Sequence, residues 1–388
     1  MLYIAPVDFK YGAQKSLYTL MTTLKRDYGV TPVLLTKKQG GLNELCDEQG
    51  IENHSFWHRD ILAGGHYNFF LLTFCKHAVK FFFFLLGAVS RKFVGFSKID
   101  FSSIDLIHTN NSRNDIGVYL RKKYNIPHIW HIRELGEEDY NVVMYKRNCI
   151  NYMNDNADHF IAISDVVKNS WVKKGISSNK ITRVYNGISP ELFYPRIEST
   201  DNILKLVICG RIQPNKCQLQ LIDAIALLST DVRVGVHVDI LGDGYADYEA
   251  VLRSRVKDLG LEKHVKFVGY KDNISKLLAE YDVGVMCSKA EAFGRVTVEY
   301  MFAGLTVIAS DTGANPEIID NMQDGMLYSW GDTKCLAEKI TKVYRNREFA
   351  NQLADAGRVK AEALFTDNVY AKAVYEIYCR LLNGTKAE

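Results

Sequence analysis

The segment from Val283 to Gly304 reads VGVMCSKAEAFGRVTVEYMFAG and predicts a strand, a loop and a helix, in that order. Val283–Cys287 is a short, continuously apolar run, which is typical of a strand with both faces covered. The helix follows Gly294 and is expected to end near Gly304, since glycine commonly ends helices. A strand followed by a helix is the repeating part of the βαβ unit, from which parallel sheets are built.

The same alternation extends in both directions from this segment. Helical stretches such as Ala13–Asp27, Asp115–Tyr124 and Asp165–Lys174 separate most of the apolar runs. The expected strands are Leu2–Pro6, Pro32–Thr36, Ile104–Thr109, His128–His131, Phe160–Ile163, Ile181–Tyr185, Leu204–Cys209, Val234–Leu241, Val265–Val268, Val283–Cys287, Thr306–Ala309 and Met326–Tyr328. The sequence therefore predicts an α/β protein with two Rossmann-like, doubly wound parallel-sheet domains that face each other across a cleft.

The alternation breaks once, near the middle of the chain. Residues 186–190 read NGISP, which is turn chemistry, and Pro195–Asn202 is polar without periodicity. We expect an amino-terminal Rossmann-like domain at residues 1–195 and a carboxyl-terminal one at 196–365; the family resemblance described below implies acceptor binding for the first and nucleotide-sugar binding for the second. Residues 366–388 contain a last helical stretch, Asn368–Leu382, expected to pack back toward the amino-terminal domain. Ligands of such sheets bind at the carboxyl ends of the strands.

Composition excludes several classes of protein. The chain has 388 residues, 47% hydrophobic and 24% charged, with a net charge of +3. These values exclude disorder and coiled coil as the main architecture, and no basic field indicates nucleic acid. The eight cysteines include no CxxC pair, which is typical of reduced thiols in a cytosolic protein. Met1–Pro6 reads as a first strand and not as a secretory signal.

One segment leaves its environment open. From Ile61 to Ile99 there is no acidic residue, yet Lys76, His77 and Lys80 interrupt the phenylalanine-rich runs. A transmembrane helix is disfavoured, because no uninterrupted apolar span of sufficient length exists. Two alternatives remain: a buried helix with lysines that extend to solvent, or a helix in the membrane interface. In the second, the aromatic residues of segment 69–98 would enter lipid and its lysines would meet anionic headgroups.

Basic residues surround the start of the helix that follows Leu204–Cys209. The loop Gly210–Lys216 reads GRIQPNK, and it places Arg211 and Lys216 where backbone N–H groups and the helix dipole also favour anions. Arginine offers a planar fork for phosphate oxygens, and lysine offers a point charge. The arrangement suits a diphosphate; two solvated surface charges are the alternative.

Two carboxylates frame the loop and helix of the opening segment. Glu291 lies in the loop and Glu299 in the helix, and both can point toward the cleft. Carboxylates bind sugar and ribose hydroxyls well, because each accepts two or more hydrogen bonds. After the next strand, the backbone N–H groups of Thr312 and Gly313 form either a second turn facing an anion or a plain turn. We expect Glu317 to be a first-turn helix residue.

Taken together, these motifs resemble a known family. Gly210–Lys216, Leu241–Gly244, Glu291–Glu299 and Ser310–Ile319 occur in the order and spacing of the retaining glycosyltransferases of family 4, which have the GT-B fold. The pair of glutamates separated by seven residues is the most specific piece. Tyr11–Ser16 resembles the first glycine-rich loop of that family, and Asn186–Ile188 its Asn-Gly element before the linker. The resemblance covers essentially the whole chain and is looser in the first half.

The resemblance implies roles for the carboxyl-terminal motifs. Arg211 and Lys216 would bind the donor diphosphate and stabilise its growing charge, and Glu299 would hold the ribose hydroxyls. Glu291 would contact the transferred sugar. The backbone near the phosphate or sugar would come from Phe293, Gly294 and Arg295, and a further donor contact from Thr312.

It also implies roles in the amino-terminal half. A lone histidine is usually structural, but His131 ends a strand and resembles the active-site histidine near the sugar. Gly12 and Ala13 would line the acceptor side. Three residues depart from the pattern: Gln14 replaces a common glutamate, Tyr11 a common glycine, and Arg295 a usual apolar residue. Arg295 adds a cation beside the donor site.

The sequence therefore predicts a cytoplasmic enzyme that moves a sugar from a UDP-linked donor to a glycan or lipid-linked glycan acceptor. Its location, free in the cytoplasm or peripheral on the inner face of the plasma membrane, stays open. Surface polysaccharide or glycoconjugate assembly is the expected context. The expectation that the sugar keeps its anomeric configuration follows from the resemblance alone. No Asp-x-Asp motif lies in a plausible loop, so we expect no cofactor and no obligatory metal ion. A catalytically silent glycan-binding protein and a nucleotide-sugar epimerase are the alternatives. A nicotinamide dehydrogenase is disfavoured, since no GxGxxG follows the first strand.

Overall fold

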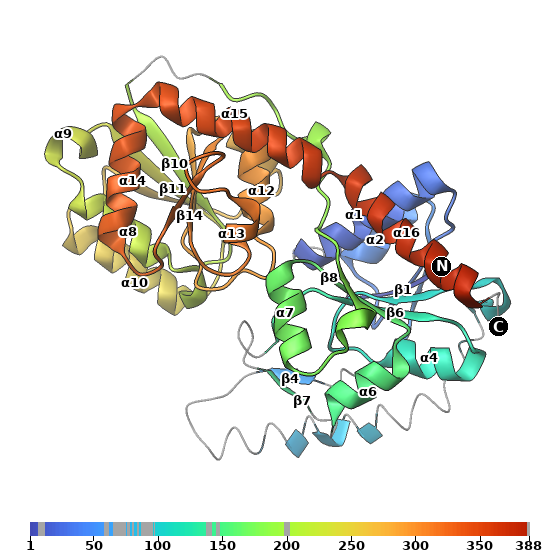
Figure 1. The fold of residues 1–388 in the computed structure, drawn as a ribbon. Helices are drawn as coiled ribbons and strands as arrows, with labels where there is room; N and C mark the ends of the chain where they lie inside the picture. The colour runs from blue at the N-terminus through green and yellow to red at the C-terminus, as the bar shows by residue number, and fades with distance from the viewer. Residues whose placement is uncertain are drawn as a thin grey trace. The chain divides into compact units, whose positions relative to one another are not determined.

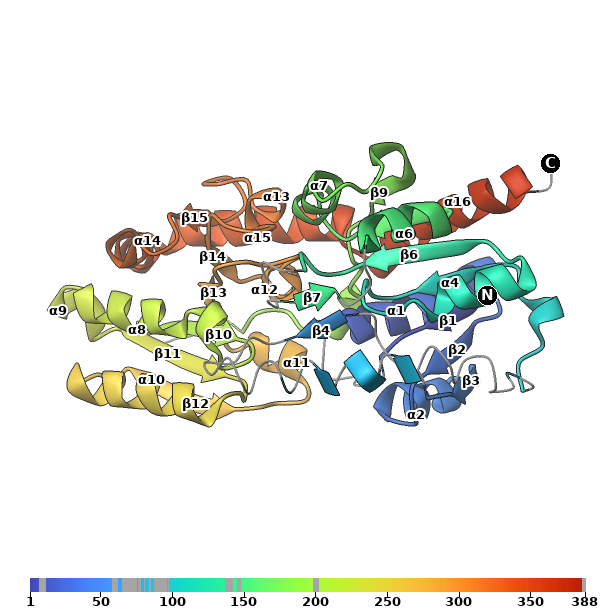
Figure 2. The same ribbon diagram turned by 90° about the horizontal axis from the view of Figure 1, so that it is seen from below.

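The fold is described from a computed structural model of the chain (Figures 1 and 2). It describes residues 1–6, 12–57, 62–64, 75, 78–79, 81–83, 85–86, 96, 98–136, 142–144, 148–197 and 202–385. The chain divides into two compact units. The first consists of Met1–Gly187 and Asp367–Glu388, and the second of Ile188–Thr366. Each unit contains its own parallel sheet.

The sheet of the first unit has seven strands in the order β3-β2-β1-β5-β6-β8-β9, and every neighbouring pair is parallel. The chain builds outward from β1 to β3 and then returns to place β5 beside β1, so the switch point lies between β1 and β5. The strands are β1 Leu2–Ile4, β2 Val33–Thr36, β3 Glu52–Ser55, β5 Ile107–Thr109, β6 His128–Ile132, β8 His159–Ala162 and β9 Ile181–Arg183. A separate antiparallel pair joins β4 Leu62–Gly64 and β7 Val142–Met144.

The last helix of the chain belongs to this first unit. Helix α16 packs along α1 (Figure 1), and its residues Tyr370, Val374 and Tyr378 share one buried core with Leu17 and Leu20 of α1. The helices of the unit are α1 Gly12–Tyr28, α2 Gly41–Glu48, α4 Ile116–Tyr124, α6 Cys149–Asn156, α7 Asp165–Lys173 and α16 Asp367–Thr385, with short 3-10 turns at Phe101–Ser103 and Ser178–Lys180.

The second unit repeats this topology with six strands in the order β12-β11-β10-β13-β14-β15, again all parallel. Its switch point lies between β10 and β13. The strands are β10 Leu204–Cys209, β11 Val236–Leu241, β12 Val265–Gly269, β13 Val283–Met286, β14 Thr306–Ser310 and β15 Met326–Tyr328. The helices are α8 Gln218–Leu227, α9 Thr230–Arg233, α10 Ala246–Asp258, α11 Ile274–Leu278, α12 Arg295–Phe302, α13 Asn315–Ile318, α14 Thr333–Arg345 and α15 Arg347–Leu364, with 3-10 turns at Pro190–Leu192 and Pro214–Lys216.

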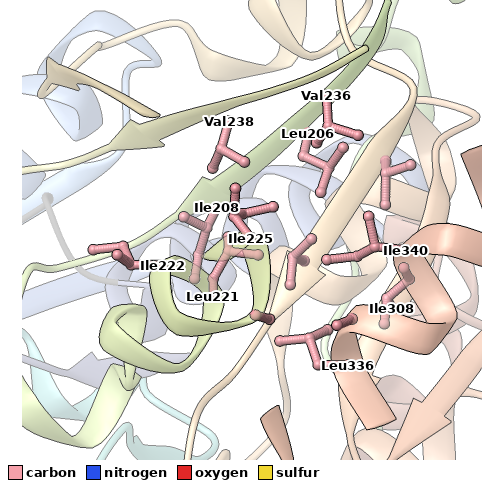
Figure 3. Packing of buried hydrophobic residues seen from close by; sticks show 14 of the residues in the cluster. Leu206, Ile208, Leu221, Ile222, Ile225, Val236, Val238, Ile308, Leu336 and Ile340 are labelled. Atoms are coloured by element: carbon pink, nitrogen blue, oxygen red, sulfur yellow. The ribbon is translucent and has the colours of Figure 1, made fainter. Parts of the chain in front are cut away.

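Both faces of this second sheet are covered. Leu206 and Ile208 of β10 pack into an apolar cluster with Ile222 of α8 and Ile340 of α14 (Figure 3). Val207, between the two strand residues, points to the opposite face and is also fully buried. The continuous apolar strands follow from this burial on both sides. The prediction of two parallel-sheet α/β domains is confirmed.

Two details differ from the expectation. The second unit begins at Ile188, before the expected boundary at residue 196. Ile188 donates its backbone N–H to Phe365 (2.9 Å), and Phe193 stacks on Phe302, so this stretch is anchored to the second unit. Strand β3 was not expected, because its sequence, ENHS, lacks apolar residues. It forms at the edge of the sheet, where β2 supplies its pairing.

Most of segment 69–98 lies outside the described residues. Within the part that the structure describes, Phe81, Phe82, Phe83, Leu85 and Leu86 have exposed side chains. This exposure disagrees with a helix buried in the core. Among the residues described, no helix combines the length and the apolar character needed to cross a membrane.

Candidate active site

Three loops meet at the carboxyl ends of β10, β13 and β14. The backbone N–H of Lys289, after β13, donates to the carbonyl of Asn215, after β10 (2.9 Å). The N–H of Ala314, after β14, donates to the carbonyl of Glu291 (2.9 Å), and the Thr312 hydroxyl donates to the carbonyl of Ser288 (2.9 Å). These bonds lock the loops together at the switch point between β10 and β13, where ligands of doubly wound sheets bind.

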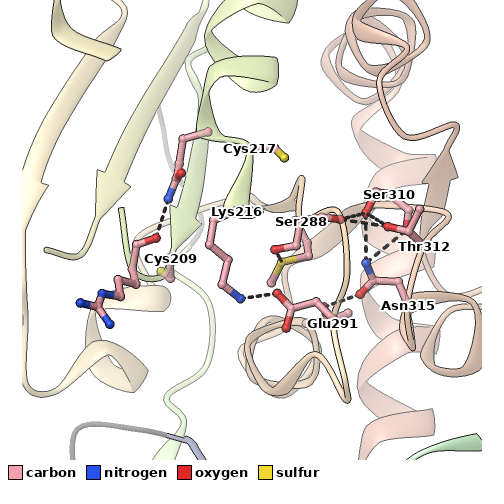
Figure 4. A network of polar contacts seen from close by, with 12 residues as sticks. Cys209, Lys216, Cys217, Ser288, Glu291, Ser310, Thr312 and Asn315 are labelled. Atoms are coloured by element: carbon pink, nitrogen blue, oxygen red, sulfur yellow. Dashed lines mark hydrogen bonds and ion pairs between the residues drawn. The ribbon is translucent and has the colours of Figure 1, made fainter. Parts of the chain in front are cut away.

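An ion pair joins the first two of these loops. The Lys216 ammonium contacts the Glu291 carboxylate (Figure 4), and the two side chains are 25% and 13% exposed. Lys216 ends the 3-10 turn before α8, so its side chain reaches across from β10 to the loop after β13. An ammonium has three donors. Contact with one carboxylate oxygen therefore leaves it able to bind a phosphate at the same time.

The loop after β14 approaches Glu291 so closely that only glycine fits. Gly313 has a φ of +59°, and a Cβ at this position would collide with the backbone nitrogen and oxygen of Glu291. Glycine adopts such a φ without steric cost. Because Gly313 has no side chain, the loop after β14 can pack directly against the backbone of Glu291 and hold it in place.

Glu299 is placed by helix α12 and by a second ion pair. Arg295 Nε lies 2.8 Å from Glu299 Oε1, one helical turn away, and the side chains are 16% and 10% exposed. The helix follows Gly294, whose φ is +77°. Phe293 is buried against Phe365, with ring centroids 6.0 Å apart, so its side chain anchors the loop. The burial of its side chain leaves only the backbone of Phe293 to meet a ligand.

Arg211 stands apart from these two ion pairs. Its side chain is exposed, and its guanidinium carbon lies 4.9 Å from the centre of the Tyr245 ring. Its carbonyl accepts a hydrogen bond from Gln218 Nε2 (3.0 Å). Nearby, Gln218 Oε1 and Asn215 Oδ1 are buried without a hydrogen-bond partner among the described residues. Such acceptors are costly to leave unpaired, so this loop offers sites for donor groups of a ligand.

The side chain of Thr312 is held inside the loop network. Its hydroxyl lies 3.0 Å from the Ser310 hydroxyl, and Asn315 Nδ2 donates to the Ser310 carbonyl (3.1 Å; Figure 4). The contribution of Thr312 to an anion site would therefore come from its backbone. Glu317 lies in the first turn of the short helix α13, as expected.

The remaining predicted residues lie in the first unit. Gly12 begins α1, and the Ala13 carbonyl accepts a hydrogen bond from Asn110 Nδ2 (3.2 Å). His131 lies in β6 and is fully buried. Its Nδ1 is 3.0 Å from His108 Nε2. Burial lowers the pKa of His131 well below its usual value, and the Arg133 charge lowers it further, so the ring is neutral.

A buried arginine beside His131 was missed in the sequence. Arg133 is 7% exposed, and it donates to Asn110 Oδ1 (2.6 Å), Asn186 Oδ1 (2.5 Å) and the Tyr370 hydroxyl (2.8 Å). The signal was the run HIRE at residues 131–134, where charged residues directly follow an apolar strand. Asn186, the first residue of the Asn-Gly element, thereby helps to hold the buried Arg133 in place.

Groups of three or more His, Cys, Asp or Glu side chains that could hold a metal ion are absent from the described part of the chain.

Two family models match the chain. Residues 195–360 match glycosyl transferases group 1, and residues 11–192 match glycosyltransferase family 4. An uncharacterized glycosyltransferase of Methanocaldococcus jannaschii is 27% identical over 68% of this chain and 72% of its own length. The N-acetyl-alpha-D-glucosaminyl L-malate synthase of Bacillus anthracis is 25% identical over 62% of this chain and 64% of its own length, just under two thirds.

Solved structures share the fold. Anabaena HepE, crystallised in complex with UDP and glucose, superposes with a TM-score of 0.78 over 97% of this chain and 98% of its own. Its sequence identity is 22%, so this likeness concerns the fold. WaaG, a glycosyltransferase of lipopolysaccharide biosynthesis, superposes with a TM-score of 0.66 at 14% identity, over 97% of this chain and 99% of its own.

Proposed function

We propose that this chain, whose two halves match the family models of glycosyltransferase family 4 and of glycosyl transferases group 1, moves a hexosyl group from a UDP-linked sugar to a glycan or lipid-linked glycan, with retention of anomeric configuration. The observation that carries the proposal is the Lys216–Glu291 pair at the switch point between β10 and β13. There the Lys216 ammonium, which can bind a diphosphate, contacts the Glu291 carboxylate, which can bind sugar hydroxyls.

The donor is inferred from this pairing and from the structural relative. Lys216 and Arg211 provide positive charge around the start of α8, and Glu299 provides a carboxylate for ribose hydroxyls. HepE of Anabaena has been crystallised with UDP and glucose. A UDP-sugar would place its diphosphate against the two cations and its sugar against Glu291. We propose that these cations make a metal ion dispensable.

The proposed mechanism follows from where charge develops. As the bond to the sugar breaks, negative charge grows on the departing diphosphate, and Lys216 and Arg211 stabilise it. On the same face of the sugar, the diphosphate oxygen takes the proton of the incoming hydroxyl. Glu291 holds the sugar hydroxyls during this step, and the family resemblance adds His131 as a contact to the sugar. Gly12 and Ala13 are proposed for the acceptor side, and the backbone of Thr312 for the donor side.

A lipid-linked acceptor is supported by the segment 69–98. Of its described aromatic residues, Phe81, Phe82 and Phe83 are 44%, 59% and 37% exposed, whereas Phe96 is buried. Exposed aromatic side chains next to lysines favour attachment to the surface of an anionic membrane. We therefore propose that the protein works in the cytoplasm, at the inner membrane face, in surface polysaccharide or glycoconjugate assembly.

The test is turnover of a panel of nucleotide sugars, measured as release of the nucleoside diphosphate with and without crude membrane lipid as acceptor. We expect one UDP-sugar to be consumed by the wild type. Glu291→Gln should lose this activity, whereas Glu338→Gln, an exposed glutamate on α14, should keep it. Wild type that consumes no donor in the panel would instead favour the catalytically silent glycan-binding protein.

A further inference from the structure

Three buried rings form a line of hydrogen bonds inside the first unit. The Tyr378 hydroxyl on α16 lies 2.6 Å from His108 Nδ1 on β5. His108 Nε2 lies 3.0 Å from His131 Nδ1 on β6. All three side chains are fully buried. The line ends at His131 Nε2, which is buried and has no hydrogen-bond partner among the described residues.

The protons in this line can be arranged in two directions, and Arg133 favours one of them. Its Nη2 lies 3.4 Å from His131 Nδ1, and a guanidinium has donors but no acceptor. A proton on His131 Nδ1 would therefore face both an N–H and a positive charge. A lone pair on Nδ1 would instead accept a hydrogen bond from the guanidinium N–H and be attracted to its positive charge. His131 is neutral because burial and Arg133 lower its pKa, so its single ring proton must lie on Nε2.

The hydroxyl of Tyr378 supports the same direction. If His131 Nδ1 accepts, then His108 Nε2 donates to it, and His108 Nδ1 accepts from Tyr378 across 2.6 Å. In the opposite direction, the Tyr378 hydroxyl would accept from His108 and would donate its own hydrogen bond to the Tyr3 oxygen, across 3.4 Å. A separation of 2.6 Å is within the usual range for an O–H donor and shorter than the usual range for an N–H donor, so the Tyr378 hydroxyl is the donor. Burial also lowers the pKa of His108 well below its usual value, so His108 carries a single proton.

We propose that Tyr378 and His108 are positioning residues that hold His131 as the Nε2-protonated tautomer, so that His131 offers an N–H donor to a sugar oxygen rather than acting as a base. This inference rests on the proposed function, in which His131 contacts the transferred sugar. Histidine tautomers are commonly set by the partner of the other ring nitrogen. Here that partner is itself oriented by a residue of the last helix, 270 residues further along the chain.

The proposal gives α16 a part in the chemistry. Tyr378 fixes the His108 ring, and Tyr370, on the same helix, accepts a hydrogen bond from Arg133 (2.8 Å). Both contacts converge on His131 Nδ1. A donor that is already oriented in a dry site stabilises developing negative charge without reorganisation during the reaction. A sugar oxygen is an acceptor for the otherwise unpaired N–H.

The test observes the tautomer directly and needs no activity. Protein labelled with ¹⁵N-histidine is studied by long-range ¹H–¹⁵N NMR at neutral pH, and the His131 signals are assigned by their loss in His131→Gln. We expect an Nε2 with an attached proton and an Nδ1 without one. A His131 signal with the proton on Nδ1 would overturn the proposal, whatever the enzyme's substrate is.

Variants then test the chain of contacts. Tyr378→Phe should shift His131 toward the Nδ1-protonated form and lower kcat by about tenfold, with UDP affinity unchanged, since loss of one preorganised donor costs ~10²–10³ and Tyr378 acts only indirectly. His108→Leu should do the same, whereas His108→Gln should rescue, because its amide N–H₂ replaces Nε2. Tyr375→Phe on α16, where Tyr375 packs on Tyr28, is the matched control.

These measurements separate two failures. A wild type without turnover but with the expected tautomer would contradict the proposed function and leave the hydrogen-bond line in place. An active wild type in which Tyr378→Phe changes neither the tautomer nor kcat would overturn the positioning role.

Discussion

The ammonium of Lys216 contacts the carboxylate of Glu291, although the two residues are 75 positions apart in the sequence. The family resemblance assigns them different partners, a phosphate and a sugar. In a nucleotide sugar, those two groups are joined by the bond that breaks during transfer. The contact therefore brings the two side chains together where the proposed reaction takes place. It also means that a change at either residue alters the electrostatics of the other.

The first prediction concerns the cations of the donor site. We expect UDP to bind in the micromolar range in excess chelator, since the proposed anion site consists of Arg211, Lys216 and the start of a helix. Arg211→Ala or Lys216→Ala should weaken UDP binding by about 10–100-fold, because a hydrogen bond to a charged group contributes ~1.5–3 kcal/mol. Binding of uridine should change little. Titration calorimetry measures each affinity.

Lys334→Ala, an exposed lysine on α14, provides the control for net charge. UDP binding that depends on added Mg²⁺ or Mn²⁺ would contradict the proposal of a metal-independent site. An equal loss for UDP and uridine would indicate that the loop itself had been disturbed.

The second prediction concerns the close approach of Gly313 to Glu291. Gly313→Ala and Gly304→Ala both place a side chain at positive φ, +59° and +72°. A Cβ at Gly304 meets nothing within 4 Å, whereas one at Gly313 collides with the Glu291 backbone. Both should lower stability by about 1–2 kcal/mol through the backbone conformation. Only Gly313→Ala should also lower kcat, by about 10²-fold, because a small misplacement of a reacting group has that effect.

Thermal unfolding and steady-state kinetics on the two variants separate these effects. If Gly313→Ala retains full turnover, the loop after β14 does not position Glu291.

Much of the fold could be predicted from hydropathy alone. Strands β10 (Leu204–Cys209) and β15 (Met326–Tyr328) have the predicted ends, because buried parallel strands are continuous apolar runs bounded by loop residues. β3 could not be found this way. It is an edge strand with the sequence ENHS, and it is set by pairing with β2 and not by its own side chains.

The candidate site could be predicted in its residue types but not in its contacts. Arg211, Lys216 and Glu291 follow strands, and Glu299 lies in the helix after the loop that contains Glu291, which is a signal that the sequence contains. Which cation meets which carboxylate depends on the order of strands in the sheet, because β10 and β13 are neighbours only in space. The contact between His108 and Tyr378 could not be predicted either, because it forms only when α16 returns to the first unit.

The third prediction concerns residues 69–98. Wild type should sediment with anionic phospholipid vesicles at low salt and less so at high salt. Replacement of the basic residues Lys76, Lys80, Arg91 and Lys92 by glutamine should weaken this by about 1 kcal/mol per charge. A matched control replaces four exposed basic residues elsewhere, Arg253, Arg255, Lys257 and Lys334. Wild type that stays in the supernatant would exclude membrane attachment through this segment.

The fourth prediction separates the two glutamates by their kinetics. Glu291→Gln should keep its fold, bind UDP at least as tightly as wild type, and lose about 10²–10³ in kcat. Its UDP affinity should not fall, because removing this carboxylate frees the Lys216 charge for phosphate. A group that contacts the sugar as charge develops acts more strongly in the transition state than in the ground state.

Glu299→Gln should behave differently. The ribose is bound equally in both states, so losing this carboxylate should raise KM for the donor and leave kcat largely intact. Its partner Arg295 loses a contact at 2.8 Å, and the freed cation, which the family resemblance places beside the donor, should partly offset the loss for UDP. Glu338→Gln serves as the control, and thermal unfolding of every variant checks the fold. If both variants keep full kcat and unchanged KM, the assignment of the site to this pair of carboxylates fails. If the two effects are exchanged, with Glu299→Gln losing kcat and Glu291→Gln raising KM, the sugar lies against α12 and the ribose against the loop after β13.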